Sequence, residues 1–348
     1  MKAAIFDALR QPLALAELAE PEPDRYQVLL KVCRCGICGS DLHITDDPVF
    51  GARRGDVLGH EFSGEVLEVG SAVTDLKVGD QISVAPLKGC GHCDSCRRGE
   101  PAWCAQMALI GGGYAQYAAV AARQCRKLPW GISAADGALA EPLAVALHGL
   151  TQSGLKPGDR VLIVGAGAIG LAVAFWARRL GAGAVAVSDL HRHQETRAME
   201  LGASAFFEAG PDLVAQVSAQ LGGAPDIVFE CVGKPGLIDH CIAHVRPRGT
   251  VVVLGLCTAT DHFDAFRAIS KEVRIVMSVF FSMQEFGCAI DALDGGRFAP
   301  QALISETIGL GELPEVFEAL RQRTTQCKVL VDPHAPMASI APPVSLAP

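Results

Sequence analysis

Four cysteines lie within one short stretch of the chain, CGHCDSCRRGEPAWC, with the spacing C-x2-C-x2-C-x7-C. Four thiolates at this spacing can surround one tetrahedral Zn²⁺ and close its coordination shell, which leaves no position for a substrate. The alternative is an iron–sulfur cluster, but Ala105 stands where the ferredoxin motif has a proline after its last cysteine. The spacing therefore predicts a structural zinc held by Cys90, Cys93, Cys96 and Cys104.

A second set of metal-binding residue types is spread more widely. Cys38 lies in CGICGSDLH, His60 and Glu61 lie in LGHEFSG, and Glu141 begins EPLAVALHG. One thiolate, one imidazole and one or two carboxylates are the ligands of a catalytic zinc, which keeps one position open for water or substrate. These residues predict a working metal site, and they leave open which carboxylate binds the metal at a given step.

A glycine-rich turn indicates a dinucleotide site. GAGAIG has the GxGxxG spacing between an apolar strand and a helix, and Asp189 ends the next strand, 189 − 170 = 19 residues after Gly170. Such a turn brings a pyrophosphate to the helix N-terminus, and the acid binds the adenosine ribose and repels a 2′-phosphate. The pattern favours NAD over NADP, although Arg192 and Arg197 lie close enough to weaken that preference. The predicted cofactor-binding residues are Gly165, Gly167, Ala168, Ile169, Gly170, Asp189, Leu254 and Gly255.

The elements that position these residues change in type along the chain. The first 140 residues contain short β-rich segments broken by glycine, proline and charge, whereas apolar strands alternate with helices from about residue 142. That alternation predicts right-handed βαβ units and a parallel sheet. KVLVD, at 328–332, reads as a strand that returns to the first part, and the proline-rich residues 333–348 read as a tail.

Composition excludes several classes of protein. The 348 residues carry a net charge of −8, with 50% hydrophobic and 20% charged residues, which argues against disorder and against nucleic acid or a membrane surface as partner. Asp7 interrupts any signal peptide and no apolar run suits a membrane span, so we expect a cytoplasmic protein. Thirteen cysteines then indicate metal ligands or buried thiols rather than disulfides. The thiols interpreted as buried hydrophobic residues are Cys125, Cys231, Cys241, Cys257, Cys288 and Cys327.

A series of motifs carries a family resemblance over nearly the whole chain. GHEFSGEVLEVG, KVGDQI, the cysteine loop, GGGYAQYAAV, EPLAVALHG and VLIVGAGAIGL follow in this order. The chain resembles the zinc-dependent medium-chain alcohol dehydrogenases, in particular the sorbitol and threonine dehydrogenase-like branch. The resemblance implies a GroES-like β-barrel catalytic domain (1–142, with 280–348 returning to it) and a Rossmann NAD-binding domain (143–279) with a doubly wound parallel sheet. It also implies a homodimer or homotetramer.

The resemblance assigns roles around the catalytic zinc. Cys38 and His60 match the first two zinc ligands, and Glu141 stands where many members have a second cysteine ligand. Glu61 matches a direct or intermittent ligand. Asp41 matches an acid that orients the ligand histidine.

The resemblance also implies a route for the substrate proton. Ser40 matches the hydroxyl that touches the substrate oxygen, and His43 matches the outer end of a proton relay. The implied reaction passes a hydride between the carbinol carbon and the nicotinamide, with zinc as the Lewis acid.

The substrate is the least determined property. The polyol-oxidising branch has polar residues where this chain has Ile44 or Thr45 and Phe281. The leading prediction is therefore a secondary alcohol or its ketone, including cyclic alcohols and diols, with a sorbitol-like polyol or L-threonine as the alternative. The metal ligands argue against a zinc-free quinone or enoyl reductase, and Ser40 with His43 argues against a catalytically silent NAD(P)-binding structural protein.

Overall fold

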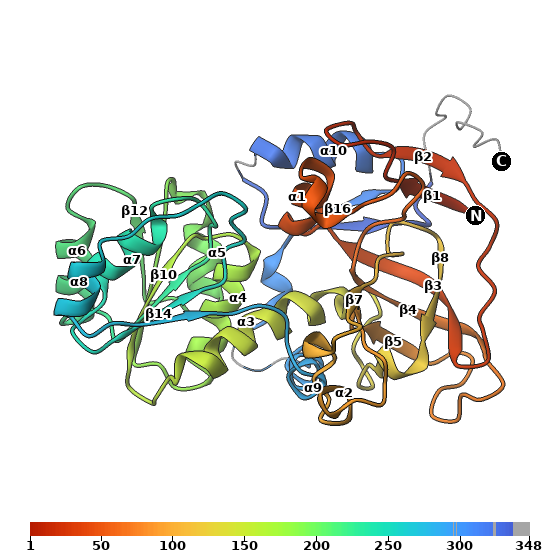
Figure 1. Cartoon of the computed structure of the whole chain (residues 1–348), viewed down its shortest axis with the longest axis horizontal. Helices are drawn as coiled ribbons and strands as arrows, with labels where there is room; N and C mark the ends of the chain where they lie inside the picture. The colour runs from red at the N-terminus through yellow and green to blue at the C-terminus, as the bar shows by residue number, and fades with distance from the viewer. Residues whose placement is uncertain (295, 297, 323–324, 337–348) are drawn as a thin grey trace. The chain divides into compact units, whose positions relative to one another are not determined.

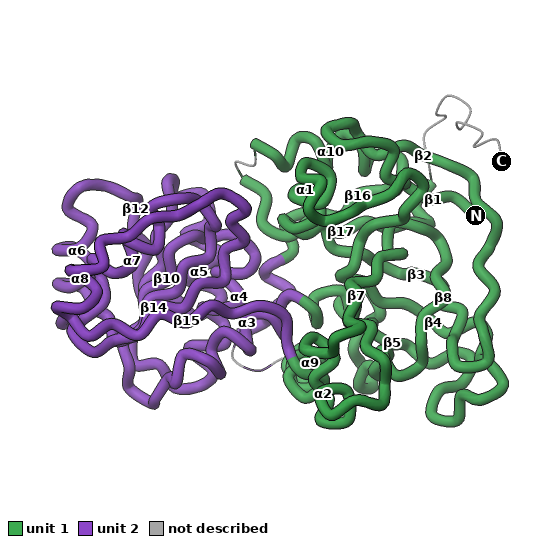
Figure 2. Tube along the Cα trace, viewed as in Figure 1, with its two compact units in different colours: residues 1–141, 282–294, 304–348 green, residues 142–281, 295–303 purple. Residues whose placement is uncertain are grey.

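The chain forms two compact units (Figure 2). The computed structural model describes residues 1–294, 296, 298–322 and 325–336. Unit 1 comprises residues 1–141, 282–294 and those from 304 onward, and unit 2 comprises 142–281 with the described residues of 295–303. The sequence predicts that all of residues 280–348 return to the catalytic domain, which corresponds to unit 1, whereas 280–281 and the described residues of 295–303 lie in unit 2. Most of the predicted tail, from residue 337 onward, lies outside the described residues.

A seven-stranded sheet forms the centre of unit 1, in the order β16-β17-β3-β4-β5-β9, with β8 also paired to β3. Its pairs are antiparallel except for β16 with β17. The long strand β3 pairs with β4, β8 and β17, and two register shifts against β4 allow it to bend between these neighbours. The strands are β3 (Gln27–Gly36), β4 (Glu61–Val69), β5 (Gln81–Val84), β8 (Tyr117–Ala121), β9 (Cys125–Lys127), β16 (Ile304–Gly309) and β17 (Lys328–Asp332).

Unit 1 also contains short helices and two small two-stranded sheets, β1-β2 and β6-β7 (Figure 1). Arg321, just after α10, donates to the carbonyl of Leu42 and to the side chains of Thr45 and Asp46, so the C-terminal turn of α1 is tied to the segment between α10 and β17. The strands of these two small sheets are β1 (Lys2–Ile5), β2 (Ala14–Glu17), β6 (Leu87–Lys88) and β7 (Ala108–Leu109), and the helices are α1 (Gly39–Asp46), α2 (Asp94–Arg97), α9 (Met283–Asp291) and α10 (Leu313–Ala319).

Six parallel strands form the sheet of unit 2, in the order β12-β11-β10-β13-β14-β15. The central strands are mostly apolar and buried, as expected for a parallel sheet with helices on both faces. The strands are β10 (Arg160–Val164), β11 (Ala184–Asp189), β12 (Ala205–Glu208), β13 (Ile227–Glu230), β14 (Thr250–Val253) and β15 (Arg274–Met277). The helices are α3 (Ala140–Ser153, which begins at the end of unit 1), α4 (Ala168–Arg179), α5 (Glu195–Glu200), α6 (Leu213–Leu221), α7 (Leu237–His244) and α8 (Ala265–Ser270). None of the helices described is long and apolar enough to cross a membrane.

The interpretation of the remaining cysteines as buried hydrophobic residues was wrong for Cys288, which is exposed. Helix α9 is amphipathic, and its buried side is formed by Phe286, Ala289 and Ile290, which places Cys288 on the solvent side. Cys231 and Cys257 are only partly buried, whereas Cys125, Cys241 and Cys327 are buried.

His244 ends α7 with both ring nitrogens buried and without a hydrogen-bond partner among the described residues. Burial lowers the pKa of His244 to about 4, and the charges of His240 and Lys271 add to this shift. The unfolded chain takes up this proton at a higher pH than the folded protein. The histidine therefore costs stability as the pH falls from 6.5 towards 4.

We expect His244→Leu to raise the free energy of unfolding by about 1–3 kcal/mol at pH 7, because no buried nitrogen then lacks a partner. The gain should be larger at pH 5, where the wild-type histidine opposes folding. Urea unfolding at both pH values measures the effect, with the half-buried His240→Leu as control. An unchanged or lower unfolding energy at pH 7 would contradict the expectation.

Candidate metal centres and active site

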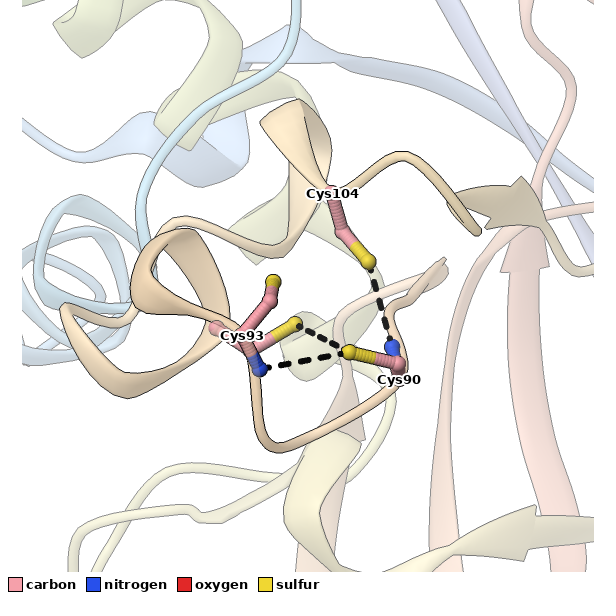
Figure 3. Close-up of side chains that lie close together, drawn as sticks. Cys90, Cys93 and Cys104 are labelled. Atoms are coloured by element: carbon pink, nitrogen blue, oxygen red, sulfur yellow. Dashed lines mark hydrogen bonds between the residues drawn. The ribbon is translucent and has the colours of Figure 1, made fainter.

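The four cysteines of the loop converge on one point in unit 1. The sulfur atoms of Cys90, Cys93, Cys96 and Cys104 all lie within 4.8 Å of one another, so the set fits one tetrahedral metal ion. The backbone amide of Cys90 donates to Cys104 Sγ at 3.3 Å, and that of Cys93 donates to Cys90 Sγ at 3.4 Å (Figure 3). The backbone amide of Gln106 also donates to Cys104 Sγ at 3.3 Å. Backbone amides of His92 and Cys93 lower the pKa of Cys90 to about 6, which favours the thiolate that a metal requires.

This loop also packs on α9, since the backbone amide of Met283 donates to the carbonyl of Gly99 at 2.7 Å. A metal in the loop would therefore hold together α2, the segment around Cys104 and the contact with α9. No ligand position would remain for a substrate.

We expect Cys96→Ala to remove one zinc per chain and to lower the free energy of unfolding by about 4 kcal/mol or more, as for other losses of a structural metal. The hydride-transfer rate per folded molecule should stay unchanged. Metal analysis, thermal unfolding and single-turnover kinetics check this, with the exposed Cys288→Ser as control. A stable variant that had lost hydride transfer would overturn the structural assignment.

The second metal group combines residues from a helix cap and a strand start. Cys38 is the N-cap of α1, His60 immediately precedes β4, and Glu61 begins β4. Their ligand atoms lie within 4.8 Å of one another. The set of thiolate, imidazole and carboxylate fits a zinc site with an open position. His60 and Glu61 are 5% and 0% exposed, so this group is largely buried.

Two neighbours on α1 complete the surroundings of these ligands. Asp41 Oδ1 lies 3.1 Å from Nδ1 of His60, and its Oδ2 accepts from the backbone amide of Cys38 at 3.2 Å. Because Nδ1 faces Asp41, Nε2 of His60 is left for the metal. The Ser40 hydroxyl lies 3.1 Å from Cys38 Sγ and 3.5 Å from His60 Nε2, beside the candidate ligand atoms.

Two predicted residues lie outside this close group. Glu141, in the first turn of α3, is 6% exposed but is not among the residues whose ligand atoms meet within 4.8 Å. Burial raises the pKa of Glu141 to about 7, with His60 acting in the opposite direction. His43 is half-buried on α1, and within the described residues no hydrogen bond joins its ring to Ser40.

Glu61 has a buried counter-ion, Lys328, that was not among the residues predicted from the sequence. Lys328 Nζ, at the start of β17, lies 2.7 and 2.6 Å from the two carboxylate oxygens of Glu61 and also donates to the carbonyl of Ile37 at 3.0 Å. Both ionic side chains are at least 97% buried. A Cβ at Gly36 would overlap the Glu61 carboxylate, so glycine is required on β3 where the strand faces it.

The dinucleotide turn has the backbone that its sequence predicts. Gly165 has φ +104°, and a Cβ there would lie 2.6 Å from Val232 Cγ2, while a Cβ on Gly170 would overlap the carbonyl of Gly165. Asp189 ends β11 and accepts from the amide of Ala166 at 2.7 Å, which fixes its carboxylate beside the turn. Ala168 and Ile169 open α4, whereas Gly167 precedes it and Leu254 and Gly255 follow β14. These positions all lie at the carboxyl edge of the parallel sheet, where dinucleotides bind.

Three site neighbours were missed from sequence: Lys328, Tyr114 and Arg321. A lysine inside the otherwise apolar KVLVD was the available indication, because a buried lysine needs a partner. Tyr114 and Arg321 gave no local signal, since both act on residues of α1 that are far away in the sequence.

Comparison with known families agrees with this geometry. Residues 24–130 match the alcohol dehydrogenase GroES-like domain, and residues 168–295 match the zinc-binding dehydrogenase domain. (R,R)-Butanediol dehydrogenase of Bacillus subtilis is 32% identical, covering 96% of this chain and all of that protein. A probable D-xylulose reductase A of Aspergillus clavatus is 33% identical, covering 86% of this chain and 87% of that protein.

Solved structures that resemble this chain over nearly its whole length are also dehydrogenases. A structure described as a short chain alcohol dehydrogenase from Escherichia coli CFT073, complexed with NADH, has a TM-score of 0.85 at 27% identity, covering 95% of this chain and 99% of that one. A zinc-binding dehydrogenase from Sinorhizobium meliloti bound to NADP has a TM-score of 0.85 at 31% identity, with the same coverage.

The chain belongs to the family of zinc-dependent medium-chain alcohol dehydrogenases. The predicted fold class, a GroES-like domain with a Rossmann-type parallel sheet, is confirmed, as is the predicted enzyme class, an NAD- and zinc-dependent oxidoreductase acting on CH–OH groups.

Proposed function

We propose that this enzyme interconverts a secondary alcohol, including cyclic alcohols and vicinal diols, and its ketone, with NAD as the cofactor. The observation that carries the proposal is the position of the Ser40 hydroxyl against Cys38 Sγ and His60 Nε2. A hydroxyl in this place meets a substrate oxygen that enters the open metal position. Units 1 and 2 serve as the catalytic and NAD-binding domains.

The chain's own residues prepare the site for this reaction. When bound, zinc supplies a Lewis acid that lowers the pKa of the substrate hydroxyl, and NAD supplies the hydride acceptor. Cys38, His60 and Glu61 hold the metal, with Glu141 as a further buried carboxylate close by. The Ser40 hydroxyl takes the substrate proton as it releases its own, and His43, three residues further along α1, is the outer end of this relay. The two side chains are not hydrogen-bonded to each other among the described residues, so the proton passes between them through an intervening group.

Two positions support a less polar substrate than a sugar alcohol. The Thr45 hydroxyl is buried and already donates to the carbonyl of Leu42 and accepts from Arg321, each at 2.9 Å. Phe281 is completely buried and apolar. These positions therefore offer no free polar group to a polyol, and the likeness to a butanediol dehydrogenase supports a diol.

NADH production from a panel of alcohols tests the proposal. 2,3-Butanediol and cyclohexanol should give kcat/KM values at least about tenfold above those of sorbitol, xylitol and L-threonine, since one mismatched polar contact is worth 1–3 kcal/mol. A preference for sorbitol or xylitol would replace the proposal with polyol oxidation, and a preference for threonine with amino-acid oxidation. No turnover of any member, with both zinc ions bound, would favour a non-catalytic NAD-binding protein.

The surroundings of Asp189 support NAD over NADP. Arg192 is paired with Glu195 and stacks over Phe206, and Arg197 donates to the carbonyl of Ala302 at 2.6 Å. Both arginines are therefore engaged elsewhere instead of offering a site for a 2′-phosphate.

We expect Asp189→Asn to lower kcat/KM for NAD by about 10- to 100-fold, because charge-assisted bonds to the ribose are lost. The activity with NADP should rise as repulsion disappears. The amide oxygen can still accept from Ala166, so the turn keeps its shape. Kinetics with both cofactors measure the ratio, and Asp212→Asn at the exposed start of α6 is the control. An unchanged ratio would remove Asp189 from the cofactor site.

We further propose a homodimer or homotetramer. Strand β15 is an outer strand of the unit 2 sheet, and exposed apolar side chains lie on β15 and α8: Met277 is 68%, Phe266 79% and Ile269 74% exposed. Exposed apolar groups beside a free strand edge favour association. Light scattering measures the oligomeric state, and a monomer at micromolar concentration would refute the proposed homodimer or homotetramer. The cytoplasmic location stays a prediction.

A further inference from the structure

A buried tyrosine extends the hydrogen-bond network behind His60. The Tyr114 hydroxyl donates to Asp41 Oδ2 at 2.6 Å, a length typical of a bond to an ionised carboxylate. The other oxygen of Asp41, Oδ1, lies 3.1 Å from His60 Nδ1. Tyr114, Asp41 and His60 are 0%, 1% and 5% exposed, so water does not compete for these groups.

The ring of Tyr114 is fixed on several sides. Its backbone carbonyl accepts from the amide of Ala4 at 2.8 Å, and its ring meets Phe317 edge-on at 6.5 Å. Gly59, immediately before His60, has φ +78°, and a Cβ there would lie 2.5 Å from Tyr114 Cδ1. The segment that delivers His60 is therefore shaped around this ring, and the fixed ring keeps the hydroxyl beside Asp41.

The Asp41 carboxylate contacts both Cys38 and His60, the first two predicted zinc ligands. Its Oδ2 accepts from Tyr114 and from the amide of Cys38, while Oδ1 faces His60. Without the tyrosine hydroxyl, Oδ2 keeps only the longer bond to Cys38, at 3.2 Å. The carboxylate could then rotate, and the imidazole would be held less firmly. Burial, with the charge of Asp41, raises the pKa of Tyr114 well above its ordinary value, so the hydroxyl keeps the proton that it donates.

We propose that Tyr114 is a positioning residue for the catalytic metal, which acts by fixing the Asp41 carboxylate and, through it, the orientation of His60. The inference rests on the proposed function, because it takes Cys38 and His60 as metal ligands. It adds a residue two hydrogen bonds away from the metal that no local motif indicates. Partners in this position commonly affect metal affinity or activity by 10- to 100-fold.

Tyr114→Phe tests the proposal, since it removes one oxygen and keeps the ring that packs on Gly59. We expect one of the two zinc ions to pass to a chelator about 10- to 100-fold faster than in the wild type, while the four-cysteine zinc is unaffected. The visible spectrum of Co²⁺ placed in the catalytic site should also change, because it reports ligand orientation. Tyr117→Phe on β8 is the matched control, since its ring contacts His334 instead.

A double-mutant cycle with Asp41→Asn separates positioning from a general packing effect. If Tyr114 acts through Asp41, adding Tyr114→Phe to Asp41→Asn should change zinc release little further. Equal effects of Tyr114→Phe in both backgrounds, or an unchanged cobalt spectrum and release rate in the single variant, would overturn the inference. If wild-type protein showed no Cys38-dependent metal at all, the proposed function itself would fail, which is a distinguishable result.

Discussion

Cys38→Ala is expected to remove one of the two zinc ions per chain and to lower kcat/KM about 1,000-fold or more. The metal supplies several kcal/mol of charge stabilisation, and each 1.36 kcal/mol changes a rate tenfold. The fold should survive, because Cys38 caps a short helix and does not cross-link the core. Metal analysis, circular dichroism and steady-state kinetics together check the expectation.

Cys33→Ala is the matched control for this variant. Cys33 lies on β3 five residues earlier and is not among the ligand atoms that meet near His60. It should keep both metals and full activity. If Cys38→Ala retained two zinc ions and normal turnover, the working site would have to lie elsewhere. The contrast with Cys96→Ala, which should lose stability instead of chemistry, is the sharpest test of the two-metal assignment.

Lys328→Met is expected to lower the free energy of unfolding of the metal-free protein by about 3–5 kcal/mol, because it leaves the Glu61 carboxylate buried without a counter-ion. Burial lowers the pKa of Lys328, but the charge of Glu61 more than offsets this and raises it to about 12, so the pair is ionic at neutral pH. Lys328→Arg keeps the charge and should lose less. Denaturant unfolding and zinc content are the measurements.

Two comparisons make the Lys328 prediction specific. Lys127→Met breaks an ion pair with Asp80 at 2.9 Å in which the lysine is 50% exposed, and such surface pairs are worth at most about 1 kcal/mol. Glu61→Gln combined with Lys328→Met removes both charges and should recover part of the lost stability. A Lys328→Met protein as stable as Lys127→Met would show that Glu61 does not depend on this partner.

The features that could be predicted from the sequence are those whose residues lie close together along the chain. The four-cysteine spacing lies within one loop, and the glycine turn with Asp189 lies within one βαβ unit, so local patterns are sufficient to suggest both. The alternation of strands and helices likewise led to the parallel sheet.

Contacts between residues that are far apart in the sequence could not be predicted from local patterns. Lys328 and Glu61 are 267 residues apart, and the pairing of β17 and β4 with β3 brings them together. Tyr114 and Asp41 are 73 residues apart, and they meet only because α1 and the segment before β8 pack in the same unit. The choice between Glu61 and Glu141 also depended on the fold. The structure places Glu61 within the ligand group and leaves Glu141 outside it.

The antiparallel pairing of β17 with β3 has a consequence for synthesis on the ribosome. Cys38, His60 and Glu61 emerge early, but the lysine that neutralises Glu61 is among the last residues of the described chain. Until then the carboxylate has no cation beside it, and the nascent first unit lacks two strands of its sheet. Domains generally fold as units while the chain is made. We therefore expect the catalytic metal to be captured tightly only once β17 has left the ribosome, whereas the cysteine loop can bind its metal much earlier in synthesis.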